Sequence, residues 1–367
     1  MSGTSLFDPV QLGELSLPNR VIMAPLTRMR AKMPGNIPWE LNAEYYRQRA
    51  SAGLIISEAT PVSPRGHGYF HTPGIHTQAQ AKGWRLVTDA VRKSGGRIFL
   101  QLWHVGRQSH NDLQPDSEPP VAPSAIASNG QSAVSPGVTK HHPVPRALDT
   151  KEIMGVVDEF RRGAELGKEA GFDGVEIHGA NGYLIEQFLT DGANRRTDKF
   201  GGTLANRARF LWEVIEAATS VWPAQSVGLR LSPANTFGGT TDSIRLAMFS
   251  YVVRELSRFD LSYLHFVEPR VNGSGDSQTY DGRLASRNFK RLIKGNTRLI
   301  SAGGHTLQSG LLALANAEAD AIAYGRLFLA NPDLPRRLAA GAPLNPYHRD
   351  TFYGGDEKGY IDYPALA

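Results

Sequence analysis

The sequence contains no cysteine, which excludes disulfide bonds, thiolate metal sites and thiol nucleophiles. It also lacks an apolar run near the roughly 20 residues that a membrane-spanning helix needs, and its start shows no basic region followed by an apolar one. Neither positive nor negative charge predominates, because 40 Lys and Arg nearly balance 35 Asp and Glu and the net charge is only +5. We therefore expect a cytoplasmic protein with neither a nucleic-acid nor a membrane partner.

Two kinds of binding motif are missing as well. Gly273 and Gly275 begin like a dinucleotide fingerprint, but the third glycine is absent and no suitable strand precedes them. No group of His, Asp and Glu has the spacing of metal ligands, and no predicted strand ends at a lysine that could form a Schiff base. The sequence therefore predicts no metal and no separate nucleotide-binding fold.

What is present is a regular alternation of short apolar strands with amphipathic helices. With 41% hydrophobic residues in 367, the chain can bury a large core. Strands are expected at residues 20–26, 53–60, 97–103, 172–177, 227–231, 263–267, 297–302 and 319–324. Helices are expected at about 38–52, 78–94, 150–170 (with Thr150 as its cap), 204–221, 244–258 and 307–317. Eight strand–helix units favour an α/β fold with a single parallel (β/α)8 TIM barrel over a doubly wound sheet, so residues 1–367 are expected to form one domain.

The alternation is interrupted once, between His104 and Thr150. This insertion follows the third strand and is rich in Pro, Ser, His and Asn. Loops of this length inside a compact domain are usually lids or binding loops. Residues 104–150 are therefore predicted to cap the barrel.

The most informative stretch runs from Gly171 to Leu184. Its strand ends at three side chains with useful chemistry, His178, Asn181 and Tyr183. An imidazole and an amide can hydrogen-bond one oxygen while a phenol supplies a proton, which suits an enzyme that polarises a carbonyl or nitro group. On this stretch alone, an ordinary strand end whose polar residues satisfy a loop remains equally acceptable.

A phosphate site is expected after the last two strands. In such barrels, glycine-bearing turns after strands seven and eight bind phosphate through backbone N–H groups. Here those turns contain Gly303 and Gly304, and Gly325 followed by Arg326, whose guanidinium can bind phosphate with a charge-assisted fork. Two ordinary turns and a surface arginine are the simpler alternative, but their joint position after strands seven and eight favours phosphate.

Other strand ends suit a flat heterocycle. Gln101 and Arg230 can hydrogen-bond a ring rich in acceptors, and apolar and aromatic residues stand beside them. A flat cofactor that carries a phosphate is best represented by FMN.

Motifs along nearly the whole chain carry a family resemblance. They are Pro18-Asn19-Arg20, Met23-Ala24-Pro25-Leu26-Thr27-Arg28, Glu44-Tyr45-Tyr46-Arg47-Gln48-Arg49-Ala50, Gln101-Leu102-Trp103-His104-Val105-Gly106-Arg107, the Gly171–Leu184 stretch, Asn206-Arg207-Ala208-Arg209-Phe210, Gly325-Arg326, Ala330-Asn331-Pro332-Asp333-Leu334 and Gly359-Tyr360-Ile361-Asp362-Tyr363-Pro364. In these motifs the chain resembles the Old Yellow Enzyme family of FMN-dependent ene reductases.

The resemblance implies a set of site residues. The implied contacts with the flavin ring are Thr27 at its O4 side, Pro25, Leu26 and Ala59 along the isoalloxazine, and Gln101 and Arg230 at the pyrimidine edge. The implied phosphate ligands are Gly303, Gly304, Gly325 and Arg326. The implied catalytic residues are His178 and Asn181, which bind the activating oxygen of the substrate, and Tyr183, which donates the proton. The implied substrate-pocket residues are Tyr69, Trp103, Phe237 and Tyr353.

The resemblance also implies a ping-pong reaction. NADPH or NADH reduces FMN and leaves, and a small electron-poor alkene such as an enone, enal, maleimide or nitroalkene takes its place. Hydride then passes from flavin N5 to the β-carbon and a proton passes from Tyr183 to the α-carbon. The sequence leaves the choice of coenzyme open, and it is compatible with a monomer or a homodimer. Two alternatives stay open: a flavin-dependent biosynthetic isomerase or cyclisation enzyme on the same scaffold, and a flavin-free barrel that binds a phosphate ligand.

Two segments depart from the family pattern. The turn at residues 232–241 is glycine-rich where a larger side chain would be expected over the substrate, and residues 268–275 match no family motif. Both lie on the substrate side. We therefore expect an unusually open pocket mouth.

Overall fold

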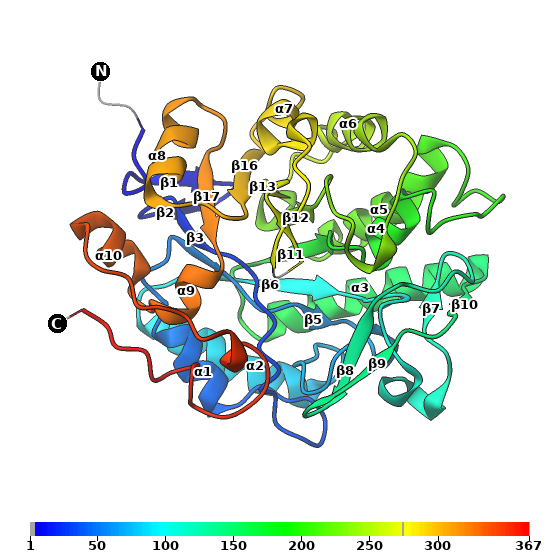
Figure 1. The fold of residues 1–367 in the computed structure, drawn as a ribbon, viewed down its shortest axis with the longest axis horizontal. Coiled ribbons are helices and arrows are strands. Elements are labelled where there is room, and N and C mark those ends of the chain that lie inside the picture. The colour runs from blue at the N-terminus through cyan, green and yellow to red at the C-terminus, as the bar shows by residue number, and fades with distance from the viewer. Residues whose placement is uncertain (1–3, 274, 367) are drawn as a thin grey trace.

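The computed structural model describes residues 4–273 and 275–366. Within them, eight parallel strands close into a barrel, because the last strand pairs with the first. In order around the barrel these strands are β3 (Val21–Met23), β4 (Leu54–Ile56), β6 (Ile98–Trp103), β11 (Gly174–Gly179), β12 (Val227–Leu231), β13 (Tyr263–Val267), β16 (Arg298–Ala302) and β17 (Ala321–Tyr324) (Figure 1). The predicted TIM barrel is confirmed, and the short β5 (Thr60–Pro61) adds a second parallel pairing to β6.

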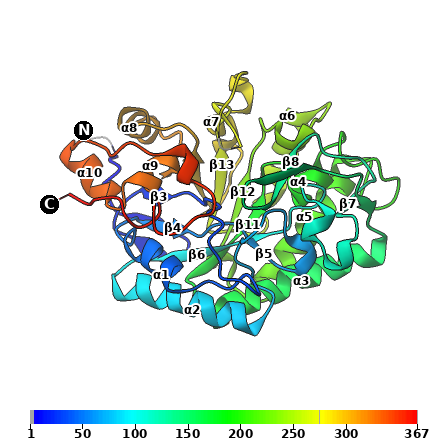
Figure 2. The ribbon, with the colours of Figure 1, turned by 60° about the horizontal axis from the view of Figure 1, so that its bottom comes forward.

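Helices surround the strands, as Figure 2 shows for α1, α2 and α3 below the barrel. They are α1 (Glu40–Arg47), α2 (Gln78–Lys93), α3 (Thr150–Glu169), α4 (Leu184–Leu189), α5 (Leu204–Thr219), α6 (Arg245–Leu256), α7 (Ser286–Lys290), α8 (Leu307–Ala315), α9 (Arg326–Ala330) and α10 (Leu334–Ala340). Short 3-10 turns occur at η1 (Pro64–Gly66), η2 (Asn111–Leu113), η3 (Pro115–Ser117), η4 (Ala224–Ser226), η5 (Phe237–Gly239), η6 (Gly282–Leu284) and η7 (Arg349–Thr351). Among the described residues, no helix has the length and apolar character required to cross a membrane.

The predicted cap of α3 is wrong by one residue. The N-cap is Asp149, whose carboxylate accepts a hydrogen bond from the Glu152 backbone N–H at 2.7 Å, while the Asp149 backbone N–H donates to the Glu152 carboxylate at 2.9 Å. This capping box satisfies two N–H groups that have no partner within the helix. Thr150 is already inside the helix, and its hydroxyl donates to Asp198 instead.

The interior of the barrel is apolar on the side of β3, β4, β16 and β17. Ile22, Leu54, Ile56, Ile300 and Ala321 meet there and are buried. The hairpin of β1 (Val10–Leu12) and β2 (Leu15–Leu17) packs its leucines against the same cluster. This apolar core leaves the carboxyl ends of the strands free for a binding cavity.

Two loop regions form hairpins that the sequence pattern did not predict. The insertion at residues 104–150 contains β7 (Val121–Ala122), β8 (Gln131–Ser135), β9 (Val138–His141) and β10 (Arg146–Ala147), with β8 and β9 paired antiparallel. After β13, residues 271–276 form β14 (Val271–Asn272) and β15 (Gly275–Asp276), between which Ser274 lies outside the described residues. Both hairpins border the cavity described below.

The segment after α10 returns to the start of the chain. The Arg28 guanidinium donates to the carbonyls of Phe352 at 2.9 Å and Gly359 at 2.8 Å, and the Tyr45 ring stacks on Tyr360 at 4.1 Å. Buried arginine–carbonyl bonds of this kind hold irregular backbone in place. The segment therefore brings Phe352 and the neighbouring Tyr353 to the wall of the cavity.

Candidate active site

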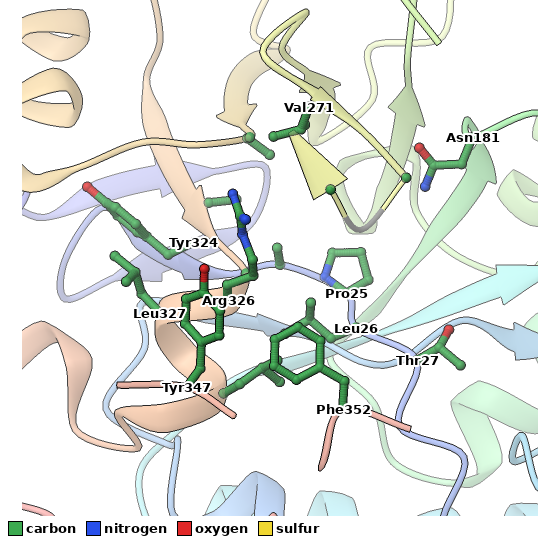
Figure 3. Close-up of a pocket in the computed structure, with 18 of the residues that line it drawn as sticks. Pro25, Leu26, Thr27, Asn181, Val271, Tyr324, Arg326, Leu327, Tyr347 and Phe352 are labelled. Atoms are coloured by element: carbon green, nitrogen blue, oxygen red, sulfur yellow. The ribbon is translucent and has the colours of Figure 1, made fainter. Parts of the chain in front are cut away.

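A cavity of about 1100 Å³ opens at the carboxyl ends of the barrel strands. Its lining includes all of the site residues expected from the sequence, which are Pro25, Leu26, Thr27, Ala59, Tyr69, Gln101, Trp103, His178, Asn181, Tyr183, Arg230, Phe237, Gly303, Gly304, Gly325, Arg326 and Tyr353. In Figure 3, Arg326 and Tyr347 lie at one end of the pocket, and Thr27 and Asn181 lie at the other. The structure thus brings the expected residues together in one elongated site.

His178 presents a hydrogen-bond donor to this cavity. The Ala180 backbone N–H points at His178 Nδ1 at 3.3 Å, so Nδ1 acts as the acceptor and the ring hydrogen is assigned to Nε2. Burial, together with the nearby Arg230 and His265, lowers the pKa of His178 well below its ordinary value. The imidazole is therefore neutral at physiological pH and can donate through Nε2–H.

Asn181 is held by its backbone. Its φ of +57° lies in the left-handed region, which asparagine tolerates better than most residues. Its N–H donates to Ser232 Oγ at 2.7 Å, and its carbonyl accepts from Gln108 Nε2 at 3.0 Å. Hydrogen bonds thus hold both the N–H and the carbonyl of Asn181. Its side-chain amide, which lines the cavity, can therefore bind a ligand there.

Tyr183 immediately precedes α4 and stands between two rings. Its ring makes edge contacts with Trp103 at 4.9 Å and His178 at 5.1 Å, and its hydroxyl is 3.2 Å from the Tyr69 hydroxyl. Burial raises the pKa of Tyr183 well above its ordinary value, and the contact with Tyr69 adds to the rise. The phenol is therefore protonated across the physiological range and can act as a proton donor.

Gln101 and Arg230 enter the cavity from β6 and β12, the two strands on either side of β11. Arg230 is 8% exposed, and its Nε and Nη1 atoms are buried without a hydrogen-bond partner in the described chain. Buried charged donors of this kind ordinarily bind an acceptor, so we expect a ligand to supply the acceptor for these two Arg230 atoms. The carbonyl-bearing pyrimidine edge of a flavin has the required acceptors, and FMN fits this donor set.

The opposite end of the cavity suits a phosphate. Gly303 has a φ of +109°, and a Cβ there would meet Val271 Cγ2 at 2.7 Å, so only glycine fits the turn. Arg326 donates to Asp276 at 2.6 Å, and its guanidinium lies 5.9 Å from the centre of the Tyr347 ring. Arg270, which no sequence motif indicated, approaches Gly304 and has a buried Nε without a partner in the described part of the chain.

The insertion contributes to the cavity as well. Lining residues on the β8–β9 hairpin are Gln131, Ala133, Ser135, Val138 and Thr139, with Gly137 at the turn. None of them was expected individually, because their segment carries no motif and its hairpin could not be placed from the sequence. Tyr353 stands at the rim with 49% of its surface exposed. The unusually open mouth expected from residues 232–241 and 268–275 stays a prediction.

Comparison with known proteins places this site in a family. Residues 5–345 match the NADH:flavin oxidoreductase / NADH oxidase family. The chain is 47% identical to 12-oxophytodienoate reductase 1 of Oryza sativa subsp. japonica, over 98% of this chain and 93% of that protein. Among solved structures, a morphinone reductase is 50% identical with a TM-score of 0.93, and the match covers 100% of this chain and 97% of that chain.

A third relative is the Old Yellow Enzyme homologue of Zymomonas mobilis. It is 40% identical with a TM-score of 0.93, over 99% of this chain and all of that chain. The family match, the barrel and the donor set of the cavity agree. The chain belongs to the NADH:flavin oxidoreductase / NADH oxidase family, and within it to the FMN-dependent ene reductases of the Old Yellow Enzyme type.

Proposed function

We propose that His178, Asn181 and Tyr183 are the residues with which this FMN-dependent oxidoreductase reduces electron-poor alkenes. One observation carries the proposal: a neutral imidazole that donates from Nε2 and a protonated phenol stand 5.1 Å apart, ring to ring, in one cavity. The pKa values of the two groups shift in opposite directions, His178 downward and Tyr183 upward. A donor for an oxygen and a donor for a carbon are what reduction of an enone requires.

Gln101 and Arg230 would hold the pyrimidine edge of FMN, and Thr27 its O4 side. Pro25, Leu26 and Ala59 would lie along the ring, and the phosphate would rest on Gly303, Gly304, Gly325 and Arg326. When bound, FMN supplies the redox chemistry by taking two electrons from NADH or NADPH and passing hydride to the β-carbon of the alkene. The cavity is a single elongated site and the sequence carries no dinucleotide fingerprint, which supports the use of this site by coenzyme and alkene in turn.

The protein residues act on the substrate. His178 Nε2–H and the Asn181 amide donate hydrogen bonds to the carbonyl or nitro oxygen, and these bonds strengthen as negative charge grows on that oxygen. Tyr183 donates its proton to the α-carbon, so hydride and proton together complete the reduction. Tyr69, Trp103, Phe237 and Tyr353 would line the substrate, with Tyr69 keeping the Tyr183 hydroxyl in place at 3.2 Å.

The wider assignments rest on the same framework. Residues 1–367 would act as one FMN-binding domain with residues 104–150 as its cap, since the β8–β9 hairpin lines the cavity. NADH is a suitable reductant because morphinone reductase, a structural relative, has been solved in complex with tetrahydroNAD, and NADPH is its alternative. A cytoplasmic location is consistent with a soluble nicotinamide coenzyme. The flavin-free phosphate-binding barrel is set aside, because the family is FMN-dependent.

The experiment is a visible absorption spectrum of the purified protein, followed by anaerobic NADPH and then cyclohexenone. We expect a flavin spectrum that bleaches with NADPH and returns with the enone. A flavin that bleaches but does not return would contradict reduction of simple enones and favour an isomerase or cyclisation enzyme on the same scaffold. A parallel run with NADH identifies the preferred coenzyme.

A further inference from the structure

Beneath the active-site cavity, one half of the barrel interior is polar. β6, β11, β12 and β13 are neighbours in the sheet and carry Gln101, Glu176, Arg230 and His265, all of which are buried. The strand register places Glu176 opposite Gln101, and Arg230 opposite His265. The other half of the barrel is apolar. Two members of the polar group, Gln101 and Arg230, line the cavity.

Glu176 is the centre of that group. Its Oε1 accepts from Gln101 Nε2 at 2.6 Å and its Oε2 accepts from His265 Nδ1 at 2.9 Å, so each carboxylate oxygen is bound. Burial would raise the pKa of Glu176, but the contacts with His265, Arg230 and Gln101 outweigh burial and lower it. The side chain is fully buried and does not line the cavity, so it does not touch a bound ligand.

The charges of the group nearly cancel. Burial lowers the pKa of His265 below its ordinary value, so its ring is neutral at physiological pH. Arg230 is then the cation of this group and Glu176 its anion; they stand on the neighbouring strands β12 and β11, and the positive charge of Arg230 helps to lower the pKa of Glu176. In a medium of low dielectric constant such a counter-charge strongly reduces the field that the cation exerts on a neighbouring group.

Glu176 also fixes the amide of Gln101. Because a carboxylate only accepts hydrogen bonds, it selects the Nε2 end of Gln101 and leaves Oε1 for another partner. The Gln101 backbone N–H is held in turn by Ser57 Oγ at 3.0 Å. A ligand at this edge of the cavity therefore meets a defined acceptor from Gln101 beside the donors of Arg230.

We infer that Glu176 is a positioning residue for the cofactor: it is the counter-ion that limits the positive charge of Arg230 at the flavin, and it sets the orientation of Gln101. The inference rests on the proposed flavin contacts of Gln101 and Arg230. Glu176 acts through these two residues and reaches neither the flavin nor the substrate. Its two tasks, charge and orientation, can be separated by substitution.

Glu176→Gln keeps the size of the side chain and removes its charge. The uncompensated Arg230 then favours the anionic reduced flavin, and we expect the reduced cofactor to be bound at least tenfold more tightly relative to the oxidised form. For a two-electron couple, tenfold corresponds to a rise of about 30 mV in the midpoint potential. Glu176→Asp keeps the charge and withdraws it from Gln101, so we expect a midpoint potential near that of the wild type with weaker FMN binding.

The test is a spectroelectrochemical titration of FMN-loaded wild type, E176Q and E176D, with FMN dissociation constants from flavin fluorescence. Glu159→Gln is the matched control, since Glu159 is a partly buried carboxylate on α3, lines a different pocket and should leave the potential unchanged. An unchanged or lower potential in E176Q, or an equal rise in E176D and E176Q, would overturn the inference.

If E176Q does not fold, weaker FMN binding by E176D at an unshifted potential supports the inference, and unaltered binding overturns it. Wild-type protein that takes up no FMN would overturn the proposed function as well, which separates the two failures.

Discussion

Replacing Tyr183 with Phe removes the proton donor and little else. The ring contacts with Trp103 and His178 are kept, and the Tyr69 hydroxyl loses its contact with the Tyr183 hydroxyl. A single such bond contributes about 1 kcal/mol to stability, so the variant should fold and retain FMN. The effect should therefore appear in the chemistry.

The size of that effect follows from the surroundings of the phenol. A positioned general acid contributes roughly 10²–10⁴-fold, which is about 2.7–5.4 kcal/mol at 1.36 kcal/mol for each tenfold step. The Tyr69 hydroxyl, 3.2 Å from the lost group, is a second phenol that can deliver a proton through water. We therefore expect the loss of rate in Y183F to lie toward the lower end of this range. The loss in the double variant with Tyr69→Phe should be larger.

The assay is anaerobic stopped-flow spectroscopy of the two half-reactions. Reduction by NADPH should stay close to the wild-type rate in Y183F, because no proton from Tyr183 enters that step. Reoxidation by cyclohexenone should slow by about 10²-fold or more. Equal losses in both half-reactions would refute the assignment, since a general defect of the pocket would then explain the variant.

The same experiment has a pH arm. The pKa of His178 is lowered from about 6.5 and that of Tyr183 is raised from about 10, so neither group titrates between about pH 7 and 9. The neutral imidazole and the protonated phenol are both fully populated in that window. Wild-type reoxidation should then be flat with pH, and a fall in rate with a midpoint inside the window would contradict these protonation states.

Three further predictions test other parts of the structure. Replacing both His178 and Asn181 with Ala should weaken binding of a phenol, followed by its charge-transfer band, by roughly 5- to 150-fold, since two hydrogen bonds of about 0.5–1.5 kcal/mol each are lost; an unchanged titration would rule out the pair as an oxygen clamp. Arg326→Ala should purify with little FMN, as measured by the flavin-to-protein absorbance ratio, and full occupancy would remove Arg326 from the phosphate site. Asp242→Ala should leave the buried Arg207 without its ion-pair partner and cost about 3–5 kcal/mol in a urea titration. A loss below about 1 kcal/mol would mean that this pair behaves like an exposed one.

Much of the architecture was predictable because the signals are local. Apolar strands and amphipathic helices repeat along the chain, and eight such units are enough to predict a closed parallel barrel. The carboxyl ends of its strands meet at one face, so His178 at the end of β11 and Arg230 on β12 had to approach each other. The strand-end rule therefore found the cavity residues that stand at strand ends, whereas Tyr69, Phe237 and Tyr353 were implied only by the family resemblance.

The buried polar group at Glu176 could not be found in this way. Strands covered on both faces lack the alternation of apolar and polar residues that reveals which side chains point inward. Glu176 and His265 stand inside such strands, and only the structure shows that their side chains meet in a hydrogen bond. The β8–β9 hairpin was missed for a different reason, because its two strands are short and lack a regular alternation of apolar and polar residues.

The bond from Arg28 to the Phe352 carbonyl joins residues 324 positions apart in the chain. Thr27 precedes Arg28 directly, so one end of this long connection borders the proposed flavin contacts and the other carries the wall formed by Phe352 and Tyr353. During synthesis, the first barrel strand leaves the ribosome long before the segment that completes its pocket. Contacts between such distant parts of a chain form late in folding. The cofactor site is therefore completed only after nearly all of the barrel has been made, and flavin retention should report on correct folding of the whole chain.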